Sequence, residues 1–191
     1  MGYKEIREFN HETTPASADK ILIQTDAADT TKYSTVQEIN AGGTAYGEIW
    51  VLGNAVETAI AGAGTFVQYT GFVNDGSSKD TTPAHAQDHI EIDVAGDYSC
   101  MCSFHVESIG AGAADLVSIE VRKNNGTVTY SNLHAHRKLA GGGGDVGSIS
   151  VSGILPSLSV NDTIEVWLTN EDNATNLLLV DANLTIQRIG A

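Results

Sequence analysis

The sequence predicts an all-β protein whose main body is a two-layer sandwich. From Tyr46 to Ala191, short segments of alternating apolar and polar residues follow one another, and turn residues separate most of them. Twenty glycines against three prolines favour many tight turns over stiff linkers. Apolar residues make up 41% of the 191 residues, which is a globular composition with room for one domain and a tail.

The chain begins with a segment that is unlike the rest. Residues 1–18 are polar and have no clear period, so we expect them to be extended or ordered only by a partner. Ile21, Leu22 and Ile23 then form a short apolar strand, and Lys32-Tyr33 is a candidate return strand.

A possible helix start follows this hairpin. Ser34 to Gln37 fits a capping box, but only one helical turn, to Ile39, precedes the stop at Asn40 to Gly43. A hairpin and one turn are too small to be stable alone. We therefore place a boundary at Gly42-Gly43, between an arm at residues 1–43 and a head at residues 44–191.

The head contains ten segments with the period of a strand. They are Tyr46–Leu52, Val56–Ile60, Phe66–Phe72, His89–Val94, Tyr98–Val106, Leu116–Arg122, Val128–Leu133, Gly147–Leu155, Ile164–Thr169 and Leu177–Ile189. Between two of them, Asn125-Gly126 suits a tight hairpin with positive φ at both turn positions.

The alternation assigns each residue to a buried or an outer face. In the segment Tyr98–Val106, Met101 is expected to face outward. In the last segment, the even-numbered residues from Leu178 to Ile186 are expected inside and Leu179 outside. Trp167 is also expected on an outer face. Large apolar side chains on an outer face indicate an interface.

The charge of the chain argues against several kinds of partner. The net charge is −14 and the longest basic cluster is Arg137-Lys138, so we expect no nucleic-acid binding, which needs clustered Lys and Arg. The start of the sequence has no secretory or myristoylation pattern. No apolar run approaches the roughly 18–20 residues that span a bilayer, so we expect synthesis in a cytoplasm and no membrane insertion.

Two groups of metal-ligating residue types have to be weighed. Cys100 and Cys102 lie on one expected strand, and without a second Cys pair we interpret them as buried, reduced core residues rather than a metal or redox pair. His134-x-His136 places two imidazoles on one strand face and could hold a metal. A hydrated pair is favoured, because two His residues alone rarely make a site.

Other chemical motifs are weak. The oxygen-rich turns at Asn74 to Asp80 and at Glu171 to Asn173 do not follow a complete Ca²⁺-loop spacing, so we interpret them as solvated turns. No nucleophile elbow and no phosphate-binding loop occurs in the sequence. We expect a protein that is not an enzyme and that needs no cofactor.

Several motifs of the head occur in a recognisable order. They are Gly96-Asp-Tyr98 at a strand start, the hairpin at Asn125-Gly126, the entry Leu158-Ser-Val-Asn-Asp-Thr-Ile164 to the next-to-last strand, and the ending Ala182-Asn-Leu-Thr-Ile186. In this order they resemble the ten-stranded jelly roll of the complement and tumour necrosis factor superfamily. The resemblance covers about residues 45–191 and implies a jelly-roll head.

The arm carries a second resemblance. Its motif Asp19-x-Ile-Leu-Ile-Gln24, followed by Thr31-Lys-x-x-Thr-Val-x-Glu-Ile39, is similar to the N-terminal modules of tailed-bacteriophage head fibres, tail fibres and decoration proteins. The resemblance implies homotrimeric heads that pack around a three-fold axis through one sheet. The implied trimer-interface residues are Tyr46, Trp50, Met101, His105 and Leu179. The implied virion-attachment residues are Ile21, Leu22, Ile23, Tyr33, Val36 and Ile39.

These resemblances predict a structural virion protein at the virion surface. It would be a homotrimeric head fibre or capsid decoration, anchored by its arm to the major capsid protein or to another virion protein. The alternative is a receptor-binding adhesin or short tail-fibre tip that recognises a host-surface glycan or protein. That alternative requires exposed aromatic and polar clusters at the loop tips. A hydrolase on the same scaffold is a third, less favoured, hypothesis, because no site for it is recognisable.

Overall fold

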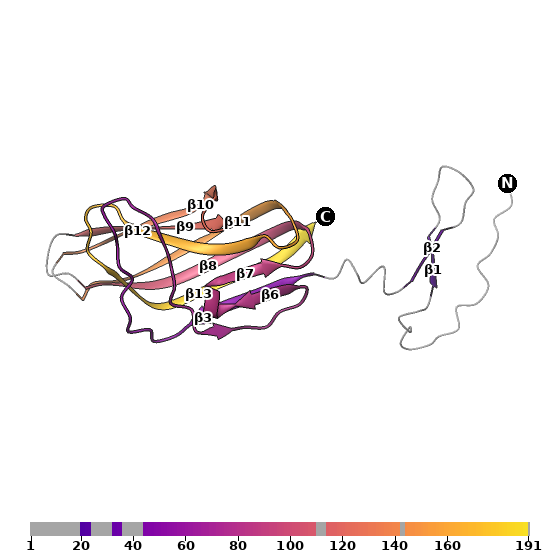
Figure 1. Ribbon diagram of the computed structural model, residues 1–191, viewed down its shortest axis with the longest axis horizontal. Helices are drawn as coiled ribbons and strands as arrows, with labels where there is room; N and C mark the ends of the chain where they lie inside the picture. The colour runs from indigo at the N-terminus through magenta and orange to yellow at the C-terminus, as the bar shows by residue number, and fades with distance from the viewer. Residues whose placement is uncertain (1–19, 24–31, 36–43, 110–113, 142–143, 191) are drawn as a thin grey trace. The chain divides into compact units, whose positions relative to one another are not determined.

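The computed structural model describes residues 20–23, 32–35, 44–109, 114–141 and 144–190. The chain divides into two compact units, Met1–Gly43 and Thr44–Ala191, and each is described by itself. In the first unit, β1 (Lys20–Ile23) and β2 (Lys32–Thr35) pair antiparallel, with Leu22 opposite Tyr33 (Figure 1). The two short strands expected there are confirmed. Val36 and Ile39 lie outside the described residues, as does the helical turn expected around them.

The second unit, the head, consists of two antiparallel sheets that face each other (Figure 1). The first, called here the β8 sheet, has the strand order β11-β8-β13-β3-β5. Its strands are β3 (Tyr46–Val51), β5 (Asn74–Asp75), β8 (Gly96–Ser108), β11 (Val146–Leu158) and β13 (Leu177–Gly190).

The second sheet, called here the β12 sheet, has the order β10-β9-β12-β7-β6, and β4 also pairs with β12. Its strands are β4 (Val67–Gln68), β6 (Thr81–Ala84), β7 (His89–Ile92), β9 (Asp115–Lys123), β10 (Val128–Leu139) and β12 (Thr163–Asn170). A short 3₁₀ helix, His85–Gln87, joins β6 to β7. No helix in the described part of the chain is long and apolar enough to cross a membrane.

The core lies between the two sheets and is formed by alternate residues of the long strands. On β8, Tyr98, Cys100, Cys102 and Phe104 are buried, as the period of two requires. Each fully buried aliphatic or aromatic side chain contributes about 1.5–3 kcal/mol through loss of apolar surface from water. The cysteines are free, and their Sγ atoms lie 3.8 Å apart, so the expectation of buried, reduced residues is confirmed.

Several expected strands differ from the observed ones. Only a single bridge, between Thr58 and Leu177, represents the expected strand Val56–Ile60. In that segment only Ile60 is buried, so it has no apolar face that would hold it in a sheet. The sequence did not reveal β6, which contains Pro83. Proline is tolerated there because β6 lies at a sheet edge.

The Asn-Gly hairpin between β9 and β10 is held by a buried carboxylate. Asn124, Asn125 and Gly126 have φ of 56°, 55° and 73°, so positive φ at both expected positions is confirmed. Asn125 N and Gly126 N donate to the carboxylate of Glu165 on β12, at 2.8 and 3.1 Å. Trp167 Nε1 donates to the same carboxylate at 3.2 Å. The fully buried Glu165 therefore fixes the turn from the neighbouring strand.

A β-bulge on β13 changes which residues face the core. Leu179 lies opposite Val106 and Asp181 lies opposite His105, so Val180 is an extra residue in the pairing with β8. Leu179 is 0% exposed. The expectation that Leu179 faces outward, and with it its assignment to the trimer interface, is therefore wrong. Because of the extra residue, the odd-numbered Leu179 faces the core before the bulge and the even-numbered Ala182 faces it after the bulge.

Candidate functional site

The outer face of the β8 sheet brings together side chains from four strands. Antiparallel register aligns them in rows, because residues directly opposite each other share a face. Two rows cross the middle of the sheet, Trp50-Asn183-Ser103-Ser150 and Glu48-Thr185-Met101-Ser152. Residues separated by more than 130 positions in the chain, such as Trp50 and Asn183, thus lie side by side.

This face carries half of the large apolar side chains that stay exposed in the described part of the head. They are Tyr46, Leu52, Met101, Val146 and Ile154. Met101 lies in the middle of the sheet and is 57% exposed. A solvated face of a sheet is normally polar, so an apolar concentration of this kind indicates a surface that is covered by a partner.

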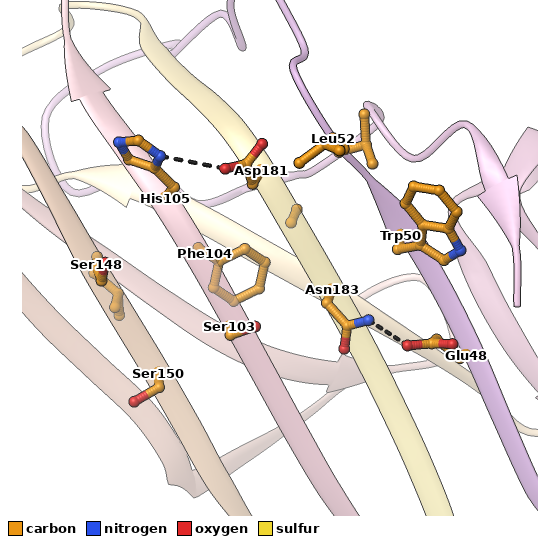
Figure 2. A pocket seen from close by; sticks show the side chains of 13 residues that line it. Glu48, Trp50, Leu52, Ser103, Phe104, His105, Ser148, Ser150, Asp181 and Asn183 are labelled. Atoms are coloured by element: carbon orange, nitrogen blue, oxygen red, sulfur yellow. Dashed lines mark hydrogen bonds and ion pairs between the residues drawn. The ribbon is translucent and has the colours of Figure 1, made fainter.

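A groove of about 530 Å³ lies on this face. Ser103, Ser148 and Ser150 line it on β8 and β11, where their small side chains leave space above the sheet (Figure 2). Trp50 and Leu52 line it on the β3 side. Apolar side chains therefore line the groove along β3, and hydroxyl groups line it along β8 and β11.

Several polar groups of the face are paired with one another. Asn183 Nδ2 donates to Glu48 Oε1 at 2.5 Å (Figure 2). Thr185 Oγ1 donates to Asn183 Oδ1 at 2.8 Å. His105 Nδ1 lies 3.3 Å from Asp181 Oδ2. Covering a polar group without a hydrogen bond costs about 1–3 kcal/mol. Because these groups keep their partners, the face can be covered at a lower desolvation cost.

The structure brings four of the five interface candidates to this face. Tyr46 and Met101 are exposed there, and Trp50 and His105 are half-buried. Leu179 is in the core. Sequence reasoning missed Leu52, Ile154 and the Glu48-Asn183 pair. One signal in the sequence could have revealed that β11 contributes side chains to this face. Every second residue from Val146 to Ile154 is exposed, and the residues between them are buried or half-buried.

The attachment candidates lie in the first unit. The structure describes Ile21, Leu22 and Ile23 as part of β1 and Tyr33 as part of β2. Their role in attachment stays a prediction.

Trp167 lies on the outer face of the β12 sheet and is covered by its own chain. The guanidinium of Arg122 lies 4.6 Å from the Trp167 ring centroid and 4.8 Å from that of Phe66. Arg122 also forms an ion pair with Glu120. Such cation–π contacts stabilise by roughly 0.5–2 kcal/mol. Trp167 therefore needs no partner to cover it.

No family model matches the sequence, and no curated protein matches it. Among solved structures, the chain is similar to Eiger TNF from S. frugiperda, with a TM-score of 0.54 and 11% identity over 77% of this chain and 93% of that chain. Murine APRIL at pH 5.0 has a TM-score of 0.48 and 12% identity, over 75% and 99%. The fold is thus a TNF-like jelly-roll sandwich, as predicted.

Proposed function

We propose that the protein is a structural virion protein, a homotrimeric head fibre or capsid decoration at the virion surface. Its heads would associate through the outer face of the β8 sheet, around a three-fold axis. Residues 1–43 would attach it to the major capsid protein or to another virion protein. The concentration of Tyr46, Leu52, Met101 and Ile154 on one sheet face is the observation that carries the proposal.

Self-association is supported by the combination of apolar and paired polar groups on that face. Specific interfaces have an apolar centre with a rim of satisfied hydrogen bonds. Here Met101 on β8 and Trp50 on β3 supply apolar surface on the two sides of β13, and the Glu48-Asn183 and His105-Asp181 pairs supply satisfied polar groups on the same face. Repetition of one face around an axis covers it in every copy and leaves no copy open.

The attachment role rests on the similarity of the arm motif to phage appendage proteins and on the separation of the chain into two units. Each arm is short, so a single arm offers only a small contact. A trimer presents three arms at once, and linked binding raises the overall affinity through effective concentration. The net charge of −14 keeps exposed heads from sticking to one another non-specifically.

The adhesin alternative is less well supported. The aromatic residues in the described connections between β3 and β5 are Phe66, Tyr69 and Phe72, and each is buried or half-buried. An aromatic platform for a host glycan is therefore not formed by these residues.

Sedimentation velocity of the full chain tests the trimer. We expect the wild type, at micromolar concentration, to sediment as a trimer of the 20.1 kDa chain. Met101→Glu places a charge in the centre of the face and should yield monomers. Val160→Glu is the matched control, because Val160 is similarly exposed at 51% but lies in the connection between β11 and β12. A monomeric wild type, or a trimeric Met101→Glu variant, would contradict the proposal.

Particle binding tests the arm. We expect deletion of residues 1–40 to leave a folded trimeric head that no longer joins particles, measured by co-sedimentation with virions. Retained incorporation would show that the arm assignment is wrong, even if the trimer is confirmed.

A further inference from the structure

Two histidines and a glutamate meet on the outer face of the β12 sheet. His134 and His136 lie two positions apart on the edge strand β10 and project from the same face, with ring centroids 4.4 Å apart. Glu171 follows the end of β12, and its backbone N donates to Leu116 O of the intervening strand β9. One ligand atom from each of His134, His136 and Glu171 lies within 4.8 Å of the other two.

We propose that His134, His136 and Glu171 bind a divalent transition-metal ion, with Zn²⁺ as the best-fitting ion. Two imidazole nitrogens and one carboxylate oxygen form a recognised Zn²⁺ ligand set. Ca²⁺ and Mg²⁺ prefer ligand shells made only of oxygen, so the two imidazoles select against them. Three protein ligands leave a fourth tetrahedral position for a water molecule.

The distances allow the three ligands to close on one ion. Zn²⁺ binds nitrogen and oxygen at about 2.0–2.2 Å, which places tetrahedral ligand atoms about 3.4 Å from one another. Starting from separations within 4.8 Å, the ligand atoms need to move inward by little more than 1 Å. His134 and His136 are exposed, so rotation of their side chains can supply that movement.

The surroundings orient one imidazole for metal binding. Ser118 Oγ, buried on β9, lies 2.6 Å from His136 Nδ1. When Nδ1–H donates to this hydroxyl, the lone pair on Nε2 is available to a metal. Such a partner on the second nitrogen is the usual accompaniment of a metal-bound His. Phe66 and His134 pack in a T-shaped arrangement, with ring centroids 5.9 Å apart.

Two neighbouring cations, Lys138 and Arg122, are each balanced by an acid. Lys138, on the same side of β10 as the histidines, lies with Nζ 2.7 Å from Asp172 Oδ2. Arg122 pairs with Glu120. An incoming dication therefore meets little net repulsion, and the chain as a whole is strongly acidic. The bound ion would link edge strand β10 to the segment after β12, across β9.

Equilibrium dialysis of the full chain against Zn²⁺, with elemental analysis, tests this site. We expect one Zn²⁺ per chain, retained against excess Ca²⁺ and Mg²⁺. Co²⁺ in its place should produce the visible absorption bands of a four-coordinate site. His136→Ala and Glu171→Gln should each weaken Zn²⁺ binding by at least about tenfold. His89→Ala removes a half-buried histidine outside the cluster and should bind Zn²⁺ as the wild type does.

Thermal unfolding supplies a second readout that can be taken on the wild type alone. An ion that binds only the folded chain raises the unfolding temperature, so Zn²⁺ should raise the Tm of the wild type and of His89→Ala, and a chelator should reverse the rise. Absence of Zn²⁺ binding by the wild type, competition by Ca²⁺, or unchanged binding by His136→Ala and Glu171→Gln would overturn the proposal. These outcomes are independent of whether the protein forms trimers or joins virions.

Discussion

Lys123 Nζ lies 2.8 Å from Asp162 Oδ2 and joins the end of β9 to the turn that precedes β12. The same carboxylate accepts hydrogen bonds from Ser159 N and Asn124 Nδ2, each at 2.8 Å. Burial alone would raise the pKa of Asp162, but the hydrogen bonds from Lys123, Ser159 and Asn124 outweigh it and hold this pKa below its usual value. Asp162 therefore stabilises the folded head as a carboxylate.

Replacing Asp162 with Asn should lower the free energy of unfolding in a way that depends on pH. A carboxyl group whose pKa is lower in the folded state contributes stability above its unfolded pKa of about 3.9, and this contribution disappears as the pH falls through the folded pKa. Urea unfolding at fixed protein concentration should show Asp162→Asn less stable than wild type by about 1–3 kcal/mol at pH 7. The difference should shrink below about pH 4. A difference that is constant with pH would contradict the role of the charge.

Glu165→Gln should destabilise the Asn-Gly hairpin. Glu165 Oε1 accepts from Asn125 N and Thr163 Oγ1, and Oε2 accepts from Gly126 N and Trp167 Nε1. An amide replaces one of these oxygens by a donor, which leaves buried donors unpaired at a cost of about 1–3 kcal/mol. Urea unfolding followed by Trp fluorescence measures the loss. Glu91→Gln, at a half-buried position on β7, is the control and should change stability much less.

Replacing two glycines that have the same φ can distinguish the cost of backbone strain from the cost of a side-chain clash. Gly126 and Gly144 both have φ of +73°. A Cβ at Gly126 would lie 2.7 Å from Trp167 Cζ2, whereas a Cβ at Gly144 would meet no atom within 4 Å. Gly144→Ala should cost only the left-handed backbone penalty of about 1–2 kcal/mol. Gly126→Ala should cost more, and equal losses in thermal unfolding would show that Trp167 moves aside freely.

Leu179→Ala tests the corrected position of this residue. Because Leu179 is fully buried, its truncation should create a cavity and reduce stability by about 2–5 kcal/mol. Met101→Ala, on the exposed face, should change the stability of an isolated head little. Chemical unfolding of both variants, made at one low concentration, compares them. A larger loss for Met101→Ala than for Leu179→Ala would place Leu179 outside the core.

The contrast between β8 and β13 explains which faces could be predicted from the sequence. On β8, polar and apolar residues alternate clearly around Met101, so the sequence assigns its outer face correctly. On β13, Leu177 to Val180 are all apolar, so the sequence does not show which of them face the core. Their inside-outside assignment depends on the bulge at Val180, which exists only in the pairing with β8. Local patterns therefore do not contain this information.

The limits of local sequence patterns also explain how much could be predicted of the outer face of the β8 sheet and of the cluster of His134, His136 and Glu171. Met101 could be selected because it is a bulky residue on the outer side of a clearly alternating strand, and Trp50 because it is a bulky residue in an expected strand. The approach of Glu171 to His134 and His136 depends on the strand order β10-β9-β12, since these residues are far apart in the chain. From the sequence, the spacing placed His134 and His136 on one strand face and favoured a hydrated pair, and the approach of Glu171 became visible once the order of the strands was known.

The pairing of β3 with β13 has a consequence for how the polypeptide matures on the ribosome. Apart from the two-residue β5, the hydrogen-bonding neighbour of β3 is β13, which is synthesised after the other described strands of the head. Until then Ile49 and Val51 have no completed sheet to cover them. Pairing between opposite ends of a chain is slow, and uncovered apolar segments aggregate. Completion of the head must therefore wait until β13 has left the ribosome, and chaperones that shield the earlier strands should raise the yield.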